Sequence, residues 1–308
     1  MKALLSHTTL ENTFHEVQVT GSKSESNRLL IIQALFSNLK IENLSESDDT
    51  KYLQNALNSD DSLIDIHHAG TAMRFLTAFF ACQPGKEVLL TGSQRMQERP
   101  IGILVEALCS MGADISYEKK EGFPPLRIKG KKLNTNKVGI KADTSSQYIS
   151  ALMLIGASFP KGLEIELIGN PTSIPYIKMT LALLDRLGIR GHFEGNRISI
   201  PHCDKLGVSH ITVESDWSSA SYFYSIAALS KGIKIRLKSY REESLQGDAA
   251  LAEIFKSFGV STQFNGEEQS ILLSKDSNDE LPESIDLDLV DTPDIAQTIA
   301  VVCFGLGI

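Results

Sequence analysis

The segment GSKSESNR, which contains Lys23, Ser24 and Arg28, combines hydroxyl groups with two cations. It lies between a short alternating strand pattern and an apolar helical pattern, so it is predicted to begin a helix. Backbone N–H groups at a helix N-terminus, together with the helix dipole, attract anions, and the two cations would strengthen that attraction. The GxxxxGK[ST] spacing of a Walker loop is absent. Taken alone, the segment is explained equally well as a capped helix with two solvated cations.

Further turns of the same kind follow along the chain. HAGTAMRF places Gly70 at a predicted helix start, and QRMQERPIG places Arg99 just before another. A guanidinium there can bind both oxygens of a carboxylate, although a single exposed Arg is more often part of a surface ion pair. The turns DTSSQY and NPTSIPYIK add hydroxyl and amide groups: Ser145, Ser146, Gln147, Ser173 and Tyr176.

The turn VDTPDIAQ carries negative charge, because Asp291 and Asp294 stand where the other turns carry hydroxyls. A carboxylate at a helix start is stabilised by the dipole, which by itself is the favoured explanation. It could also orient or deprotonate a substrate hydroxyl. Polar, cationic and acidic helix starts at matching places are expected to face a common cleft, and they suit a small substrate with phosphate, carboxylate and hydroxyl groups.

The elements that must position these turns recur with a fixed period, which indicates a duplicated supersecondary unit. Four segments each show an alternating strand, a polar turn and an amphipathic helix, with helices predicted to begin about 74 residues apart at Thr71, Ser145, Ser219 and Pro293. A Ser, Thr or Asp at each start predicts a side-chain cap. Complete copies continue with a strand, a second helix and a closing hairpin, giving the order β-α-β-α-β-β. Those second helices are predicted to end at Gly112, Gly188 and Gly259.

A shorter copy precedes these, running from VQVTGSKSESNRLLIIQALF to the helix at DDTKYLQNAL. The fifth copy stops at Ile308 after its first helix. By comparison with its neighbours, a further strand should begin there, so the chain is expected to be incomplete at its C-terminus.

Composition sets broad limits on the class of protein. A length of 308 residues suggests two domains, and a net charge of −8 argues against a nucleic-acid coat or a basic membrane-surface protein. No apolar run is long enough to span a bilayer.

The four cysteines form no CxxC pair, so neither disulfides nor zinc are expected and a reducing cytoplasm fits. His67 and His68 are predicted to lie in a strand with side chains on opposite faces, which argues against a shared metal.

Eight blocks of the sequence resemble, in order, the motifs of the 5-enolpyruvylshikimate-3-phosphate synthase family across essentially the whole chain: GSKSESNR, HAGTAMR, QRMQERPIG, DTSSQY, SxPYIK, DWSSASYF, LQGD and TPDIAQTIA. The resemblance implies an α/β fold, a two-domain inside-out α/β barrel of repeated β-α-β-α-β-β units (EPT/RTPC-like) joined by a double crossover. One domain is expected at 21–215 and the other at 1–20 plus 216–308.

The resemblance also implies a reaction. The family transfers the enolpyruvyl group of phosphoenolpyruvate to the 5-hydroxyl of shikimate 3-phosphate, releases phosphate, and serves chorismate and aromatic amino acid biosynthesis. It needs no metal or organic cofactor, and glyphosate inhibits it. A cytoplasmic monomer that binds neither nucleic acid nor membrane is expected.

Residue roles follow by motif from the same resemblance. Lys23 would contact both substrates, and Asp294 would position the 5-hydroxyl and accept its proton. The expected ligands of shikimate 3-phosphate, or residues close to it, are Ser24, Arg28, Ser145, Ser146, Gln147, Ser173 and Tyr176. Those expected for phosphoenolpyruvate are Gly70, Arg99 and Gln147.

The chain also departs from the family pattern. Thr20, His68, Phe75 and Ile174 stand where the family usually has Pro, Asn, Pro and Lys. Since Phe75 follows closely behind Gly70, an unusual response to glyphosate is expected. A later family motif with Asn, Lys, Glu and Arg, which supplies the usual proton donor, would follow Ile308. The 308 residues are therefore expected not to turn over by themselves.

Three other functions are weighed against this one. The sibling transferase acting on UDP-N-acetylglucosamine usually carries a Cys in the loop before its Arg-Pro, and GSQRMQERP has none. A non-catalytic protein could retain the shikimate 3-phosphate site. A purely structural repeat protein would not explain the placement of Lys23, Arg28, Arg99 and Asp294.

Overall fold

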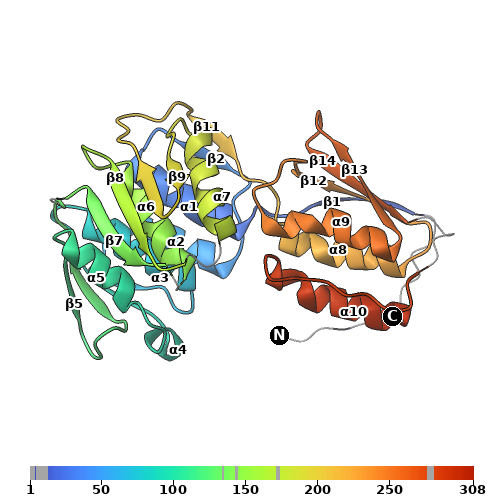
Figure 1. Ribbon diagram of the computed structural model, residues 1–308, viewed down its shortest axis with the longest axis horizontal. Helices are drawn as coiled ribbons and strands as arrows, with labels where there is room; N and C mark the ends of the chain where they lie inside the picture. Colours follow the sequence, from blue (N-terminus) through green and yellow to red (C-terminus); the bar gives the residue numbers. More distant parts are fainter. Residues whose placement is uncertain (1–3, 5–12, 134, 143–144, 171–173, 276–280) are drawn as a thin grey trace. The chain divides into compact units, whose positions relative to one another are not determined.

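The computed structural model describes residues 4, 13–133, 135–142, 145–170, 174–275 and 281–308. By its internal contacts the chain divides into two compact units (Figure 1). Unit 1 comprises 1–22 and 214–308, and unit 2 comprises 23–213. The chain therefore passes from unit 1 into unit 2 after Ser22 and returns after Val213.

Unit 2 contains two complete β-α-β-α-β-β sets. The first consists of β3 (Leu63–Asp65), α3 (Gly70–Ala81), β4 (Glu87–Thr91), α5 (Gly102–Ser110), β5 (Asp114–Tyr117) and β6 (Leu126–Lys129), with the short α4 (Gln94–Gln97) before α5. The second consists of β7 (Lys137–Lys141), α6 (Ser146–Gly156), β8 (Leu163–Ile168), α7 (Ile174–Arg186), β9 (His192–Glu194) and β10 (Arg197–Ile200). Their sheets have the equivalent orders β3-β4-β6-β5 and β7-β8-β10-β9. The equivalence confirms the repeat predicted from the sequence.

A third, smaller set completes unit 2. It consists of α1 (Lys23–Leu35), β2 (Lys40–Glu42), α2 (Asp48–Asn58) and β11 (His210–Thr212). β11 pairs with β2 in parallel, with His210 opposite Lys40. The predicted helix at DDTKYLQNAL is thus α2, and the carboxylates in its first turn suit the positive end of the helix dipole.

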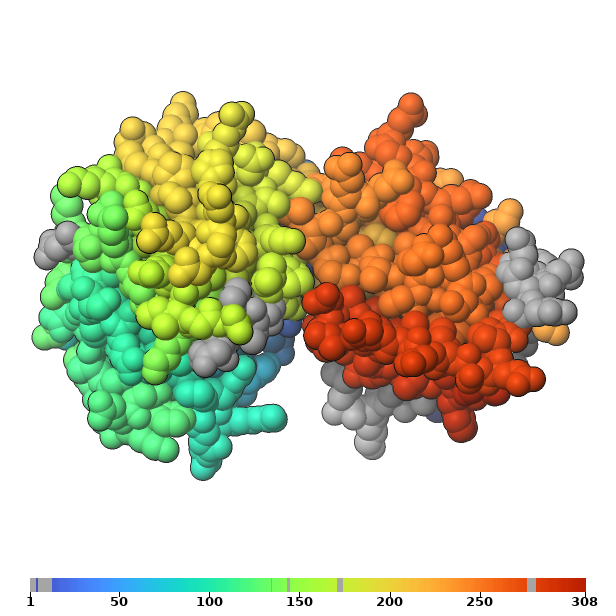
Figure 2. All heavy atoms as spheres, in the orientation of Figure 1, coloured from blue at the N-terminus to red at the C-terminus, as the bar shows by residue number. Residues whose placement is uncertain are grey.

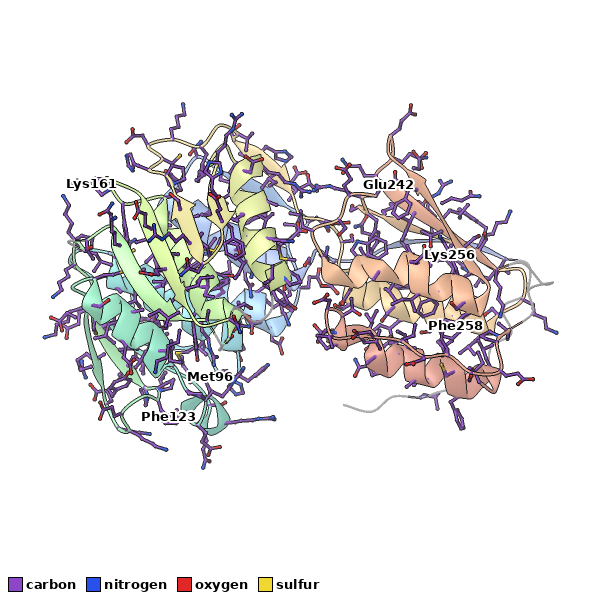
Figure 3. All side chains as sticks on the ribbon, viewed as in Figure 1. Met96, Phe123, Lys161, Glu242, Lys256 and Phe258 are labelled. Carbon is purple, nitrogen blue, oxygen red and sulfur yellow. The ribbon has the colours of Figure 1, made fainter. Side chains whose placement is uncertain are left out.

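Unit 1 holds one four-stranded sheet in the order β1-β12-β14-β13. Its elements are β1 (Phe14–Gln18), α8 (Trp217–Leu229), β12 (Lys234–Lys238), η1 (Gly247–Ala250), α9 (Leu251–Ile254), η2 (Phe255–Phe258), β13 (Val260–Asn265), β14 (Ser270–Lys275), η3 (Pro293–Ile295) and α10 (Ala296–Leu306). Its second helix is thus a chain of short pieces, and Phe258 at the end of η2 is fully buried (Figure 3).

The repeat pattern assigned two strands to the wrong copies. It grouped β1 with α1 and β11 with α8, whereas β1 pairs with β12 and β11 pairs with β2. The two strands have exchanged places. The physical reason is that Val17 and Val19 pack against the apolar core of unit 1, which also contains Trp217.

Helix α3 shows why the helices, rather than the sheets, form the interior of unit 2. All 12 of its residues are buried, and it packs against α1, α2, α5 and α6. The strands instead present one face to solvent, as in β8, where buried and exposed residues alternate strictly. A helix that is apolar around its whole circumference must lie in the core. This is the inside-out arrangement of the expected fold class.

The glycines predicted to end the second helices adopt the conformation that this role needs. Gly112, Gly188 and Gly259 have φ of 100°, 90° and 76°. Only glycine reaches this left-handed region without strain, so each ends its helix and turns the chain toward the closing hairpin.

In contrast to α3, helix α10 is only partly covered. It packs against α8 and lies at the surface of unit 1 in Figure 2. Val301 and Phe304 are 62% and 89% exposed. Its buried side, with Ile299 and Val302, joins the core of unit 1.

We predict that Gly162→Ala destabilises unit 2. Gly162 has φ +66°, and a Cβ there would lie far inside van der Waals contact with the carbonyl oxygen of Ile200. The free energy of unfolding, measured by urea titration with far-UV circular dichroism, should fall by roughly 2–3 kcal/mol. Gly195→Ala is the matched control, because Gly195 has φ +58° and open space around the position that its Cβ would take. The control should lose only about 1 kcal/mol, and equal losses would contradict the steric argument.

Candidate active site

Arg28 is the best-anchored of the expected site residues. It is 2% exposed, and its guanidinium is held by three helices. Nε donates to Thr180 Oγ1 of α7 at 2.8 Å, Nη2 donates to Ser150 Oγ of α6 at 3.1 Å, and Nη1 donates to the Ser24 carbonyl of α1 at 2.9 Å. The interpretation of this segment as a cap with two solvated cations is therefore wrong for Arg28, since this side chain points into the protein.

Two aromatic rings also lie against the Arg28 guanidinium. Its central carbon is 5.6 Å from the ring centroid of Phe75 and 5.7 Å from that of Tyr176. Burial lowers the Arg28 pKa to about 10, against the opposing influence of Tyr176 and Glu25. The group thus keeps its positive charge at neutral pH, and Phe75, which departs from the family pattern, is one of its contacts.

Lys23 and Ser24 begin α1 next to this buried group. Lys23 is exposed and Ser24 is half-buried, so both are accessible to a ligand. The Ser24 carbonyl, through its hydrogen bond with Arg28, ties the start of α1 to the buried cation.

The start of α3 and the loop before α5 come together as the motifs suggested. Gly70 is buried, and the Arg99 guanidinium occupies the space that a side chain at position 70 would need. The Arg74 guanidinium lies on the same residue, with Nη1 donating to the Gly70 carbonyl at 2.9 Å. Burial and the neighbouring charge of Arg99 both lower the Arg74 pKa. Two cations at a helix N-terminus make a site for an anion.

The start of α6 adjoins that of α3. Ser145 caps α6 by accepting from the backbone N–H of Gln147 at 3.4 Å, as predicted, and Ser146 is 5% exposed. The Gln147 amide donates to Thr71 Oγ1 of α3 at 3.5 Å. Tyr176 lies near the start of α7, whereas Ser173 falls outside the described residues. Unit 2 therefore brings together the starts of α1, α3, α6 and α7.

The predicted side-chain cap of α3 is wrong. The residue before the helix is Ala69, whose methyl side chain cannot accept a hydrogen bond. Asp49 of α2 supplies the acceptor instead, taking the backbone N–H of Ala72 at 3.3 Å and the side-chain amide of Asn27 at 2.9 Å. An acidic pair at the start of α2 is only a weak indication of this role, because the contact joins separate helices.

The histidine pair before α3 also differs from expectation. β3 ends at Asp65, and His67 has φ +51°, so the two rings turn toward one another instead of to opposite faces. Their Nδ1 atoms lie 2.7 Å apart, and Tyr52 stacks on His67. Among the described residues, no group of three or more His, Cys, Asp or Glu side chains is placed to hold a metal ion.

Asp294 lies in unit 1, in an exposed 3₁₀ turn just before α10. Thr292, which precedes the turn, makes no side-chain cap in the described structure, so the cap predicted here is wrong. Gly247 lies close to the carbonyl oxygen of Asp291. A Cβ added at Gly247 would be 2.9 Å from that oxygen. This contact places Asp248, from the LQGD motif, beside the turn that carries Asp294.

The carboxyl group of Asp248 lies close to Asp294, and its position is not predicted from the sequence. It accepts a short hydrogen bond from the Ser218 hydroxyl at the start of α8. Burial raises its pKa, the Ser218 hydrogen bond opposes the rise, and the neighbouring charges of Asp294 and Asp216 add to it. Asp216 in turn caps α8 by accepting from Ser219 N at 2.7 Å. Three carboxylates thus gather at adjoining helix starts of unit 1.

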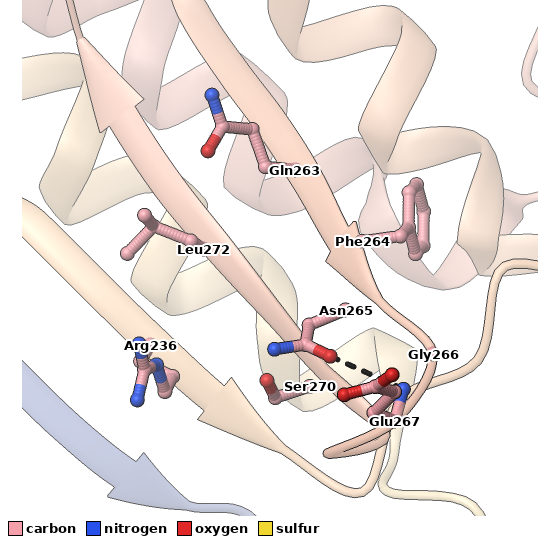
Figure 4. A pocket seen from close by; sticks show the side chains of 8 residues that line it. All are labelled: Arg236, Gln263, Phe264, Asn265, Gly266, Glu267, Ser270 and Leu272. Carbon is pink, nitrogen blue, oxygen red and sulfur yellow. Dashed lines mark hydrogen bonds between the residues drawn. The ribbon is translucent and has the colours of Figure 1, made fainter.

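A hollow on the exposed face of the unit 1 sheet is a different kind of surface (Figure 4). Its lining includes Arg236, Gln263 and Leu272, which lie on neighbouring strands. Arg236 is within 3.6 Å of Glu16 and 3.5 Å of Glu268, so its charge is balanced by two carboxylates. The hollow offers little attraction for the anionic ligands that the helix starts would bind.

Known proteins with the same fold and motifs define the class. A model of the family described as EPSP synthase (3-phosphoshikimate 1-carboxyvinyltransferase) matches residues 53–305. A 3-phosphoshikimate 1-carboxyvinyltransferase of Bacteroides fragilis (strain YCH46) is 45% identical over 293 residues, which are 95% of this chain and 70% of the relative. Another, from Haemophilus influenzae (strain PittEE), is 36% identical over 317 residues, covering 92% of this chain and 71% of the relative.

Solved structures agree in fold. An EPSP synthase from Acinetobacter baumannii superposes with a TM-score of 0.75 at 20% sequence identity, covering 94% of this chain and 71% of that one. The class is therefore that of two-domain α/β transferases. The chain belongs to the EPSP synthase family, as its motifs predicted. Within the described residues, no helix is both long enough and apolar enough to cross a membrane.

We predict that Asp248→Asn stabilises unit 1 at neutral pH. Because the folded-state pKa is raised, the unfolded state loses its proton first as pH rises, so the charged carboxylate costs stability above the ordinary pKa of 3.8. The variant should therefore have the higher free energy of unfolding at pH 7, and its advantage should shrink as pH falls toward 3.8. Fluorescence of Trp217, the single tryptophan, follows unit 1 in urea titrations.

The matched control for this measurement is Asp286→Asn, which changes an exposed carboxyl of the same unit. Its effect should be small and should not follow the same pH course. A lower stability of Asp248→Asn at pH 7 would contradict the assignment.

Proposed function

We propose that the chain carries out the reaction for which its family is named. In this reaction the enolpyruvyl group of phosphoenolpyruvate passes to the 5-hydroxyl of shikimate 3-phosphate, and phosphate leaves. The observation that carries the proposal is the buried Arg28, which ties α1, α6 and α7 together. The starts of these helices and of α3 hold the hydroxyl, amide and cationic groups that two anionic substrates require.

For shikimate 3-phosphate, we assign the starts of α1, α6 and α7. Lys23 and Ser24 are accessible beside Arg28, and Ser145 and Gln147 lie at the start of α6. Backbone N–H groups at a helix start and hydroxyl side chains suit a phosphate. The remaining expected ligands on this side are Ser146, Ser173 and Tyr176.

For phosphoenolpyruvate, we assign the start of α3 with Gly70, together with Arg99 and Gln147. The Arg99 guanidinium lies against Gly70, and the Gln147 amide reaches Thr71 in the first turn of the same helix. A fork of N–H donors beside free backbone N–H groups can bind a phosphate or a carboxylate from two sides.

The chemistry needs one base and one acid. The 5-hydroxyl oxygen forms a bond to the central carbon of phosphoenolpyruvate while the methylene carbon gains a proton, giving a tetrahedral intermediate. Loss of phosphate and of a proton from the new methyl group restores the double bond. We assign the acceptance of the hydroxyl proton to Asp294 and contact with both substrates to Lys23. Cationic side chains offset the charge that builds up around the two substrates.

The first test is calorimetric titration of the chain with shikimate 3-phosphate. We expect saturable binding, and Arg28→Lys should weaken it by about tenfold or more, because the ammonium cannot make three hydrogen bonds in one plane. Arg197→Lys, an exposed change in β10, is the matched control and should leave binding unchanged. Absence of binding by the unaltered chain would contradict the proposed function.

A second measurement separates the remaining alternatives. Release of inorganic phosphate when the two substrates are supplied together reports turnover. Binding of shikimate 3-phosphate without release of phosphate would support a non-catalytic binder. Binding of UDP-N-acetylglucosamine in place of shikimate 3-phosphate would favour the sibling transferase. A monomeric state stays a prediction, which light scattering tests.

A further inference from the structure

The carbonyl oxygen of Pro100 accepts hydrogen bonds from two buried side chains. The Tyr148 hydroxyl donates to it at 2.6 Å, and Arg74 Nη2 donates to it at 3.5 Å. Tyr148 is 5% exposed and Arg74 is 4% exposed. Pro100 directly follows Arg99, so these contacts hold the Pro100–Ile101 peptide group, one residue beyond the proposed phosphoenolpyruvate ligand.

Arg74 alone does not account for this anchoring. Its Nη1 donates to the Gly70 carbonyl at 2.9 Å, and its contact with Pro100 is at the long limit of a hydrogen bond. It also carries the same charge as Arg99, which favours their separation. The Tyr148 hydroxyl makes the shorter contact and brings no opposing charge.

The side chain of Arg99 is exposed, so packing around it does little to fix its guanidinium. The position of the guanidinium therefore depends on the backbone that carries it. The guanidinium lies against Gly70 only if the backbone at 99–100 stays where it is. Tyr148 comes from the first turn of α6 and follows Gln147, the other side chain proposed for phosphoenolpyruvate. The first turn of α6 thus carries Gln147 and, through Tyr148, the hydrogen bond to the backbone next to Arg99.

We propose that the Tyr148 hydroxyl is a positioning group for Arg99, acting through the Pro100 carbonyl oxygen. It keeps the guanidinium over the start of α3, where phosphoenolpyruvate binds. The inference rests on the proposed function for its ligand, although the tether itself does not. Small displacements of a binding group are costly because the geometry of the bound substrate depends on them.

The first experiment tests the tether without any ligand. Tyr148→Phe removes one oxygen atom and keeps the buried ring. Amide hydrogen exchange should quicken by about three- to tenfold in the segment 98–101, the ordinary consequence of losing one hydrogen bond. Two amides there report directly: Arg99 N–H bonds the Met96 carbonyl and Ile101 N–H bonds the Gly122 carbonyl. Amides in the middle of α6 should not change.

The second experiment tests the consequence for binding. Phosphoenolpyruvate is titrated calorimetrically into the chain saturated with shikimate 3-phosphate. Tyr148→Phe should weaken phosphoenolpyruvate by about three- to tenfold and leave shikimate 3-phosphate affinity within about twofold. In the background of Arg99→Ala, the same change should have no further effect, because the group being positioned is gone.

Tyr224→Phe is the matched control. Tyr224 is fully buried in unit 1, and its hydroxyl pairs with Thr262 Oγ1 at 2.8 Å, so the same atom is removed far along the chain. This variant should change neither the exchange of 98–101 nor the affinity for phosphoenolpyruvate.

Each outcome decides a separate point. Unchanged exchange in Tyr148→Phe would overturn the tether, and faster exchange with unchanged phosphoenolpyruvate affinity would overturn its role in binding. An equal loss for Tyr148→Phe with and without Arg99 would also overturn it. Failure of the unaltered chain to bind either substrate would contradict the proposed function instead, while the exchange experiment would still report on the tether.

Discussion

Unit 2 depends on placing one charged group, the guanidinium of Arg28, in its interior. Burying a charge is costly unless hydrogen bonds replace the water that it loses. Arg28 recovers them from α1, α6 and α7, and the rings of Phe75 and Tyr176 lie against the guanidinium. The buried hydroxyls of Ser150 and Thr180, themselves 3.0 Å apart, both accept hydrogen bonds from Arg28. The requirement to satisfy one cation therefore fixes how three helices meet, and their starts converge as a result.

The cost of this arrangement is consistent with a binding site rather than with stability alone. A core built only for stability would place apolar side chains of similar volume at this point. A cation is also buried at a cost in stability at the start of α3, where Arg74 lies beside a second cation, Arg99. Like charges held together are unfavourable until an anion arrives between or beside them. Binding of two multiply charged anions would explain both the buried Arg28 and the close approach of Arg74 and Arg99.

Much of the fold could be predicted from local patterns. The alternation in β8 and the glycines after α5 and α7 are properties of short segments, and the structure reproduces them. The exchanged strands could not be found in this way, because β1 and β11 have equivalent patterns and only packing decides their partners. The cap of α3 was missed for a similar reason: its acceptor, Asp49, comes from another helix.

In the site, too, features set by local sequence could be predicted, and features set by contacts between separate elements could not. Gly70 and Ser145 lie at helix starts and Arg99 lies in the loop before α5, and nearby sequence is enough to predict these positions. Tyr148 and Asp248 act across elements, and the sequence marks them only as members of a motif. The facing of His67 and His68 was mispredicted because one residue with positive φ changes the direction of the side chains, and local alternation cannot reveal it.

The place of β1 also determines the order in which the molecule can form during synthesis. Its partner β12 leaves the ribosome more than two hundred residues later, since Phe14 pairs with Lys234. Unit 2 is a continuous stretch of chain and can fold as soon as it emerges, while β1 waits with its backbone hydrogen-bonding groups unpaired. The N-terminal strand is thus made first and incorporated late. A nascent chain exposes this strand until β12 has been made.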